Sequence, residues 1–150
     1  NIKLSSDFII GYPGETQTDF EETLELMKKV KFINSYSFLF SARPGTPAFN
    51  LKTVDEELAK KRLTTFQNIS NKIKTDYRKT LLGETVPVLF ENKTKEGNKF
   101  FGRDEYFNSV IVDSKENLTG KIKNIKIIKL NHNTLFGEVG LKLIQKEFAA

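Results

Sequence analysis

The sequence contains no cysteine and no tryptophan, and only one histidine and one methionine. Without thiols the chain has no disulfide framework and no thiolate ligand for a metal ion or an iron–sulfur cluster. It also has no run of about 18 apolar residues and no signal-peptide layout. We therefore expect a soluble, cytoplasmic protein that has no membrane partner. Separately, we expect it to be a monomer.

Basic residues outnumber acidic ones, with 24 Lys and Arg against 19 Asp and Glu and a net charge of +5. This moderate excess fits a solvated surface and equally a polyanionic partner, because Lys and Arg gain affinity by releasing counterions from phosphates. The hydrophobic content of 38% is low for one compact globule but fits two small cores. With 13 phenylalanines and no tryptophan, phenylalanine is expected to fill most of the core.

The first half of the chain has the pattern of a strand, a helix and a second strand. Residues 2–11 contain a dense apolar run, typical of a parallel strand covered on both faces. Thr18–Glu21 has the form of a capping box, and apolar residues at helical spacing predict a helix over 19–31. Residues 36–40 form the next apolar strand. Two parallel strands cannot complete a sheet, so neighbours are expected upstream and the chain is interpreted as a fragment.

A long helix is predicted to follow. Thr53–Glu56 has the form of a second capping box, and the apolar spacing continues for about 25 residues to Gly83, which suits a left-handed C-terminal position. Its basic groups, Lys60–Arg62 and Arg78–Lys79, are expected to be solvated, with RNA contact as the alternative.

After Gly83 the pattern changes to five short strands with turn residues between them. They are Thr85–Glu91, Asn98–Arg103, Ser109–Asp113, Lys121–Leu130 and Thr134–Lys142. Their number and spacing predict a small antiparallel barrel of the OB type. The domains are therefore predicted as residues 1–79 and 80–147. His132 lies between two asparagines and is predicted to be an exposed turn residue, not a ligand or base.

Two loops follow the predicted parallel strands, where α/β folds bind their ligands. In the first, Gly11–Thr16, glycines allow a ligand to approach the backbone, but the spacing matches neither a Walker loop nor a dinucleotide fingerprint. In the second, Ser35–Ala48, serine and arginine side chains could hold a polar ligand. A purely structural turn explains the first loop more simply and the second equally well. Asp7, inside the first strand, is expected to be paired, because burying a lone carboxylate is costly.

Both loops belong to a wider resemblance. Asp7–Thr16, "DFIIGYPGET", resembles the fifth barrel strand and loop of the radical S-adenosylmethionine methylthiotransferases. Ser35–Ala48, "SYSFLFSARPGTPA", resembles the sixth strand of the branch that makes 2-methylthio-N(6)-isopentenyladenosine in tRNA. The likeness continues through Leu82–Thr85 into a C-terminal TRAM domain and covers nearly the whole chain. It implies the end of a TIM-like radical S-adenosylmethionine barrel of the α/β class, then a long helix and a TRAM barrel.

The resemblance implies an enzyme that methylthiolates C2 of N(6)-isopentenyladenosine next to the anticodon, using S-adenosylmethionine and two four-iron four-sulfur clusters. The cysteines that hold both clusters are absent here, so the chain is expected to bind neither cluster alone and to supply no catalytic residue and no metal ligand. One side of the cofactor pocket is predicted at Gly11, Pro13, Gly14, Glu15, Ser41 and Arg43. The general radical-enzyme pattern Gly-x-Ile-x-Gly-x-x-Glu is not matched.

Three other functions were weighed. One sibling branch modifies threonylcarbamoyl-adenosine in tRNA. Another modifies an aspartate of a ribosomal protein and usually has acidic residues where this chain has Arg43–Pro44. A non-catalytic RNA-binding module is the third, but such a module has no use for the strand–helix–strand half at residues 2–48.

The TRAM-like barrel is the expected tRNA-binding part. Its candidate residues are Lys93, Lys95, Lys99, Arg103, Lys121, Lys123 and Lys126. Residues 84–150 carry 11 basic and 9 acidic residues, an excess of only 2. Base stacking on aromatic side chains is the second usual contribution to OB-like binding, and strand alternation lets at most one of Phe100 and Phe101 face solvent.

The small charge excess generates a prediction about affinity. The chain should bind tRNA weakly through phosphates, with log K falling against log salt at a slope of roughly −2 to −4. Replacing Lys121, Lys123 and Lys126 with alanine should weaken the binding of different tRNAs alike, as measured by fluorescence anisotropy over a salt series. An affinity that ignores both salt and these three lysines would assign the RNA surface elsewhere.

Overall fold

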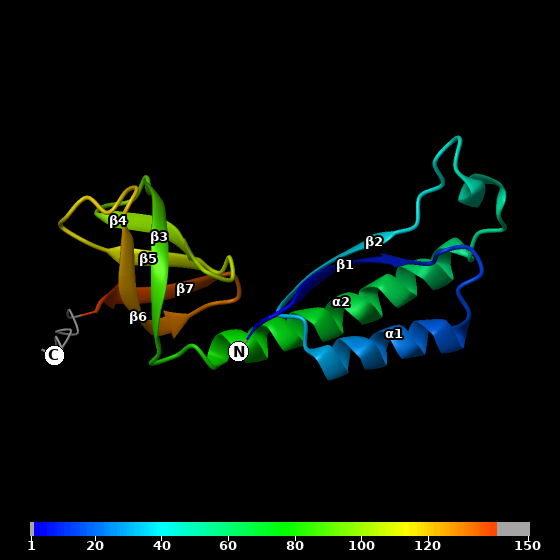
Figure 1. The fold of residues 1–150 in the computed structure, drawn as a ribbon, viewed down its shortest axis with the longest axis horizontal. Coiled ribbons are helices and arrows are strands. Elements are labelled where there is room, and N and C mark those ends of the chain that lie inside the picture. The colour runs from blue at the N-terminus through cyan, green and yellow to red at the C-terminus, as the bar shows by residue number, and fades with distance from the viewer. Residues whose placement is uncertain (1, 141–150) are drawn as a thin grey trace, which may run out of the picture. The chain divides into compact units, whose positions relative to one another are not determined.

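The computed structural model describes residues 2–140, which form two compact units (Figure 1). The α/β unit covers residues 1–77, and the barrel unit covers residues 78–150. Among residues 2–140 no helix combines the length and the apolar character that a bilayer crossing needs. The parts of the last predicted strand and of the second predicted domain that lie beyond residue 140 are outside the described residues.

The α/β unit contains a strand, a helix, a strand, a short 3-10 turn and a long helix. These are β1 (Ser5–Ile10), α1 (Gln17–Val30), β2 (Asn34–Leu39), η1 (Pro47–Asn50) and α2 (Glu56–Lys79). β1 and β2 pair in parallel, from Ser5 opposite Asn34 to Ile10 opposite Leu39. The predicted strand–helix–strand pattern is therefore confirmed, although β1 is shorter than predicted and β2 begins two residues earlier.

Both helices lie on one side of this two-stranded sheet (Figure 1). The core between them consists of Ile10 of β1, Phe20 and Met27 of α1, and Phe66 of α2, all nearly inaccessible to solvent. Phe8 joins it through ring contacts, including one to Phe66 with the centroids 4.7 Å apart. Burying each such side chain contributes roughly 1.5–3 kcal/mol, so this one small core holds the unit together.

The other side of the sheet is exposed. Ile9 lies opposite Phe38 in the strand register, and Asp7 lies opposite Tyr36. Ile9 is 59% exposed, and Tyr36 and Phe38 are each 57% exposed. The expectation of strands covered on both faces is therefore wrong for the residues described, because both helices pack on the same face. Asp7 is likewise exposed and has no hydrogen-bond partner among those residues, so its predicted pairing is wrong.

The helix starts differ from the predicted capping boxes. At α1 the box is formed by Thr16 and Asp19: the Thr16 hydroxyl accepts from the Asp19 N–H at 3.1 Å, and the Asp19 carboxylate accepts from the Thr16 N–H at 2.8 Å. These hydrogen bonds from Thr16 lower the pKa of Asp19. At α2 the Asp55 carboxylate accepts from the N–H of Leu58 at 2.9 Å. Thr18 and Thr53 were therefore the wrong caps. Thr18 already lies inside the first turn of α1, and Thr53 lies too far before α2, whereas Thr16 and Asp55 directly precede their helices.

The end of α2 also differs. The helix ends at Lys79, four residues before Gly83. Gly83 does have the left-handed backbone that was predicted, with φ +82°. Its N–H donates to the carbonyl of Ile127, so it starts the barrel and does not close the helix.

The barrel unit contains five strands that close in the order β3-β4-β5-β7-β6. They are β3 (Thr85–Lys93), β4 (Lys99–Asp104), β5 (Ser109–Asp113), β6 (Ile122–Leu130) and β7 (Thr134–Val139). All five predicted strands are present, but the all-antiparallel arrangement is wrong because β5 and β7 pair in parallel. A ring with an odd number of strands cannot alternate in direction all the way round, so one neighbouring pair has to be parallel.

Alternating side chains of these strands fill the barrel. The buried core consists of Val88, Phe90, Phe100, Val110, Val112, Leu118, Ile125, Ile127 and Leu135. Phe100 is 3% exposed and Phe101 is only partly buried, which confirms that one phenylalanine of the pair faces inward. His132 is exposed in the turn between β6 and β7, as predicted.

The exposed sheet face leads to a prediction about local stability. The amides of β1 and β2 should exchange with solvent faster than those of β3 and β6, because the two-stranded sheet has open edges and a single covered face. Hydrogen exchange followed by mass spectrometry would measure this. Equal or slower exchange in β1 and β2 would contradict the prediction and show that the α/β unit is stable without further strands.

Candidate functional site

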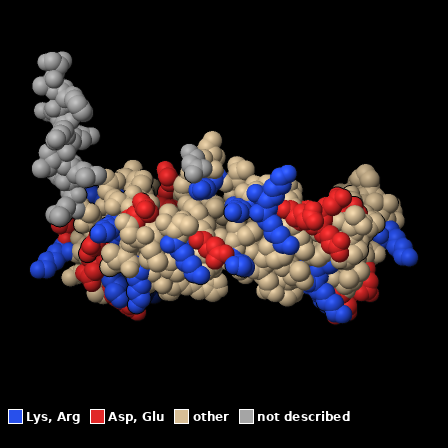
Figure 2. Space-filling view, turned by 90° about the horizontal axis from the view of Figure 1, so that it is seen from below, with Lys and Arg blue, Asp and Glu red and all other residues tan. Residues whose placement is uncertain are grey.

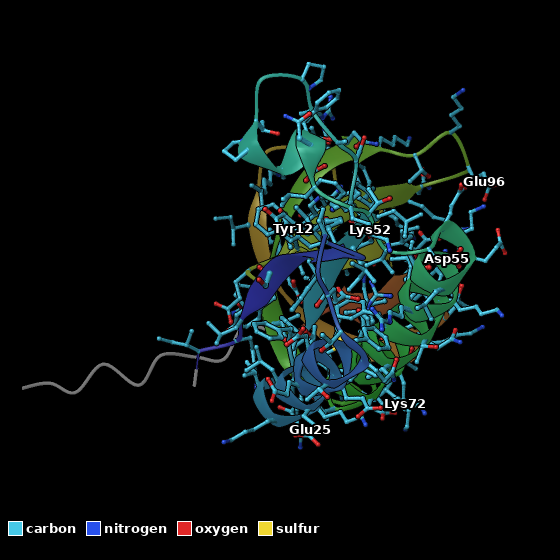
Figure 3. All side chains as sticks on the ribbon, turned by 90° about the vertical axis from the view of Figure 1, so that its right-hand side faces the viewer. Tyr12, Glu25, Lys52, Asp55, Lys72 and Glu96 are labelled. Atoms are coloured by element: carbon cyan, nitrogen blue, oxygen red, sulfur yellow. The ribbon has the colours of Figure 1, made fainter. Side chains whose placement is uncertain are left out.

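The two predicted cofactor loops meet at the carboxyl ends of β1 and β2. The N–H of Phe40 donates to the carbonyl of Ile10 at 2.9 Å, and the Tyr12 ring contacts the Phe40 ring edge-on at 5.1 Å. Figure 3 looks onto this end of the unit, where Tyr12 lies, whereas Glu25 is on the side of α1 away from the strands. The fold therefore brings the first and second loops together, as a shared ligand site would require.

Within the first loop, Gly11 and Pro13 are buried and Gly14 is exposed. Gly11 has φ +76°, and a Cβ there would lie 2.8 Å from the Cβ of Ala59 on α2. Only glycine lets the loop lie this close to the helix. Gly14 has φ +90° with open space around it, so it is the glycine that a ligand could approach.

Glu15 has a partner that the sequence did not indicate, Arg62 of α2. Its Oε1 lies 2.7 Å from Nη1 of Arg62, and its Oε2 accepts from the Gly11 N–H at 3.0 Å. The Arg62 guanidinium also donates to the Glu15 carbonyl and to Gln17, and it lies over the Phe20 ring at 5.4 Å. Its Nε is buried and has no partner among the residues described.

This contact changes the interpretation of both residues. The Arg62 side chain is 5% exposed and that of Glu15 is 12% exposed, so the prediction that Arg62 is solvated is wrong. The pairing and hydrogen bonds offset the cost of burying the cation. One signal was available in the sequence: Ala59, Arg62 and Phe66 fall on the same helical face, and all three are buried. Glu15 thereby braces the first loop against α2.

Ser41 and Arg43, in the second loop, remain as exposed candidates. Neither side chain has a hydrogen-bond partner among residues 2–140, so both are available to a ligand. In the same part of the chain no group of three or more His, Cys, Asp or Glu side chains is placed to hold a metal ion.

The seven predicted RNA-binding residues do not form one patch. Lys93, Lys95 and Lys99 lie around the β3–β4 turn, at the end of β3, whereas Lys126 pairs with Thr85 at its beginning. At about 3.3 Å per residue the two ends of β3 are roughly 26 Å apart. On the face shown in Figure 2, basic and acidic side chains are interspersed.

The candidates also differ in their contacts. Arg103 pairs with Glu91 at 3.0 Å and lies over the Phe101 ring, and Lys99 lies 3.4 Å from Glu96. Such surface pairs contribute little to stability, so a phosphate could replace the carboxylate. Lys121 and Lys126 are exposed and Lys123 is half-buried.

The turn between β4 and β5 is held by a buried carboxylate. Asp104 is 6% exposed and Asn108 is 5% exposed. Oδ1 of Asp104 accepts from the N–H groups of Tyr106 and Asn108, at 2.9 and 2.8 Å, and Oδ2 accepts from the Asn108 side chain at 2.8 Å. Phe107, at the tip, has φ +61° and is 72% exposed.

Arg78 completes this network. Its Nε donates to the Asn108 side chain at 3.1 Å, and its two Nη groups donate to the carbonyls of His132 and Asn133 at 2.7 and 2.9 Å. Burial lowers the pKa of this guanidinium, an effect that nearby Asp104 opposes. Arg78 is 4% exposed, so its predicted solvation is wrong as well. It joins two turns of the barrel unit that lie far apart in the sequence.

Comparison with known proteins identifies both parts. A family model of the TRAM domain matches residues 79–139. The tRNA-2-methylthio-N(6)-dimethylallyladenosine synthase of Pelagibacter ubique (strain HTCC1062) is 51% identical over 140 residues, which cover 92% of this chain and 31% of that protein. The synthase of the same name from Wolbachia pipientis subsp. Culex pipiens (strain wPip) is 42% identical over 139 residues, covering 91% and 32%. The chain thus spans about a third of the length of these relatives.

The buried ion pair generates a prediction about stability. Arg62→Met should lower the free energy of unfolding of the α/β unit by about 3 kcal/mol, because the Glu15 carboxylate would lose its buried partner. The double variant Glu15→Gln, Arg62→Met should recover part of that loss. Hydrogen exchange of the Met27 and Phe66 amides would measure the free energy of unfolding of the α/β unit in each variant. Lys60→Met is the matched control, since Lys60 is an exposed lysine of the same helix paired with Glu56 and Glu57. Equal effects of the Arg62 and Lys60 variants would contradict a bracing role.

Proposed function

We propose that this chain is a segment of a tRNA methylthiotransferase of the kind represented by the tRNA-2-methylthio-N(6)-dimethylallyladenosine synthases, with which it shares about 140 residues. The proposed reaction adds a methylthio group at C2 of N(6)-isopentenyladenosine next to the anticodon. The observation that carries the proposal is the 51% identity, which covers both the α/β unit and the barrel unit.

The α/β unit is proposed to be part of a radical S-adenosylmethionine barrel. In a parallel α/β barrel, helices cover the outer face of the strands and side chains from the inner face fill the interior. β1 and β2 fit such a segment, because α1 and α2 cover one face while Ile9, Tyr36 and Phe38 are exposed on the other. A non-catalytic RNA-binding module would have no reason to keep this apolar face.

S-adenosylmethionine is proposed to bind at the paired loops. It carries an adenine ring and an amino-acid group, and it supplies the methyl group and the radical chemistry of such enzymes. Gly14 leaves open space, Tyr12 offers a half-exposed ring, and Arg43 offers a cation that suits the carboxylate of the amino-acid group. These residues fit one side of a pocket, while Gly11 and Glu15 position the loop. The two iron–sulfur clusters would need cysteines, and this chain has none.

The barrel unit is proposed to bind tRNA. Its TRAM match and the exposed Lys93, Lys95, Lys121 and Lys126 support contacts with the phosphate backbone. Because the lysines are spread along β3, with Lys121 beside Phe90 and Lys126 beside Thr85, we expect them to contact separate phosphates and to contribute affinity more than sequence specificity. We also propose that the activity is cytoplasmic.

A chimera tests the proposal. This chain would replace the matching segment of the Pelagibacter relative in a bacterial strain that lacks the synthase, and mass spectrometry would measure the tRNA nucleosides. Restored 2-methylthio-N(6)-isopentenyladenosine is the expected result. Arg43→Ala should raise the KM for S-adenosylmethionine about 10-fold or more, because a charge-assisted hydrogen bond contributes about 1.5–3 kcal/mol. Lys52→Ala, an exposed cation nearby, should change nothing.

Two outcomes of the chimera would contradict the proposal. A methylthio group found on threonylcarbamoyl-adenosine would assign the sibling branch. A folded chimera with no methylthiolated nucleoside would leave the barrel unit as a binding module.

A further inference from the structure

We propose that Phe107 is a nucleobase-stacking residue and that the groove beside it receives an unpaired base of RNA. The inference rests on the proposed RNA binding by the barrel unit and names the site at which a base is held. Its starting point is that a large aromatic side chain is 72% exposed at a backbone position with φ +61°. Glycine or asparagine would normally occupy such a position, so a phenylalanine there is strained without gaining burial.

The turn that presents Phe107 is rigid. The N–H of Phe107 donates to the carbonyl of Asp104, and the N–H of Asp104 donates to the carbonyl of Asn108. The buried side chains of Asp104 and Asn108 are hydrogen-bonded to each other, and the Nε of Arg78 donates to the Asn108 side chain. The strained backbone is therefore held by surrounding hydrogen bonds, and the ring needs no ordering when a ligand arrives. Such preorganisation raises affinity by lowering the entropy cost of binding.

A groove of about 360 Å³ lies beside the ring on the outer surface of the barrel. Its apolar wall consists of Pro87 and Leu89 of β3 and Ile122 of β6. Leu89 is 48% exposed and Ile122 is 68% exposed, and the two are paired in the strand register. Together with Phe107 they form an exposed apolar surface large enough for one planar ring.

Polar groups at the edge of the groove favour a base over an apolar protein side chain. Glu91, Arg103 and Glu105 also line it. A nucleobase has an apolar face for stacking and donors and acceptors at its edge, which match a carboxylate and a guanidinium. An apolar side chain would make no hydrogen bond to these charged groups, and a phosphate would be repelled by the carboxylates.

The absence of tryptophan gives a direct test. Phe107→Trp places a single indole at the site in the full chain. Titration with single-stranded oligouridylate and oligoadenylate of about ten nucleotides should quench its fluorescence, because a stacked base quenches indole emission. Lys126→Ala in the same background is the control: it should reduce the salt slope while the maximal quenching stays unchanged.

A second variant separates stacking from folding. Phe107→Gly should weaken oligonucleotide binding at least 5-fold, since one stacked base contributes about 1–3 kcal/mol, without changing the salt slope. The same variant should raise the midpoint of thermal unfolding of the barrel by a few degrees, because glycine relieves the strain. NMR signals of Val110 and Leu135 would report that midpoint.

The outcomes distinguish the two proposals. RNA bound by the unaltered chain, with no quenching in Phe107→Trp and no loss in Phe107→Gly, would overturn the stacking site and leave the proposed RNA binding intact. No RNA bound by the unaltered chain would refute RNA binding by the barrel unit, and the stacking site with it. Quenching together with a more stable but weaker-binding Phe107→Gly would support both.

Discussion

A guanidinium group removed from water needs hydrogen-bond partners for most of its N–H groups, and both units depend on this constraint. In the α/β unit, Arg62 draws the loop after β1 onto α2 through Glu15 and Gln17. In the barrel unit, Arg78 draws together the β4–β5 turn and the β6–β7 turn. Each cation fixes the loops that carry the candidate function, because an unpaired buried charge would cost several kcal/mol.

This constraint separates residues that position a site from residues that can touch a ligand. Gly11 and Glu15 contact other parts of the unit, so Gly14, Ser41 and Arg43 are the exposed residues of the two loops that a ligand could contact. In the barrel, Asp104 and Asn108 are buried and hydrogen-bonded to each other, and Phe107 is the exposed residue of the turn that a ligand could contact. Rigid loops with a few exposed groups suit binding, since little ordering remains to be done when the ligand arrives.

The exposed apolar faces of the two units have different physical origins. Ile9 of β1 and Phe38 of β2 follow the alternation of a strand. In a complete α/β barrel, side chains on this second face fill the barrel interior. Phe107 follows no alternation: it is held out of the core by a turn with a positive φ. The first surface is therefore best explained by packing and the second by ligand contact.

The sequence by itself determined the order and type of the elements, the barrel's five strands and the similarity to the methylthiotransferases, because local periodicity, turn residues and motifs are properties of neighbouring positions. It placed Arg62 and Arg78 in solvent and missed the Asp104–Asn108 pair. The tertiary structure decided these positions, because the partners of the two arginines lie 47 and 30 to 55 residues away along the chain. It also decided the parallel β5–β7 pair, since ring closure of five strands is a property of the whole barrel. Whether a charged side chain is buried depends on what the rest of the fold brings to it. The helical face that Arg62 shares with Ala59 and Phe66 indicates the buried side of α2, but it does not indicate the partner, Glu15, that makes burial of the cation possible.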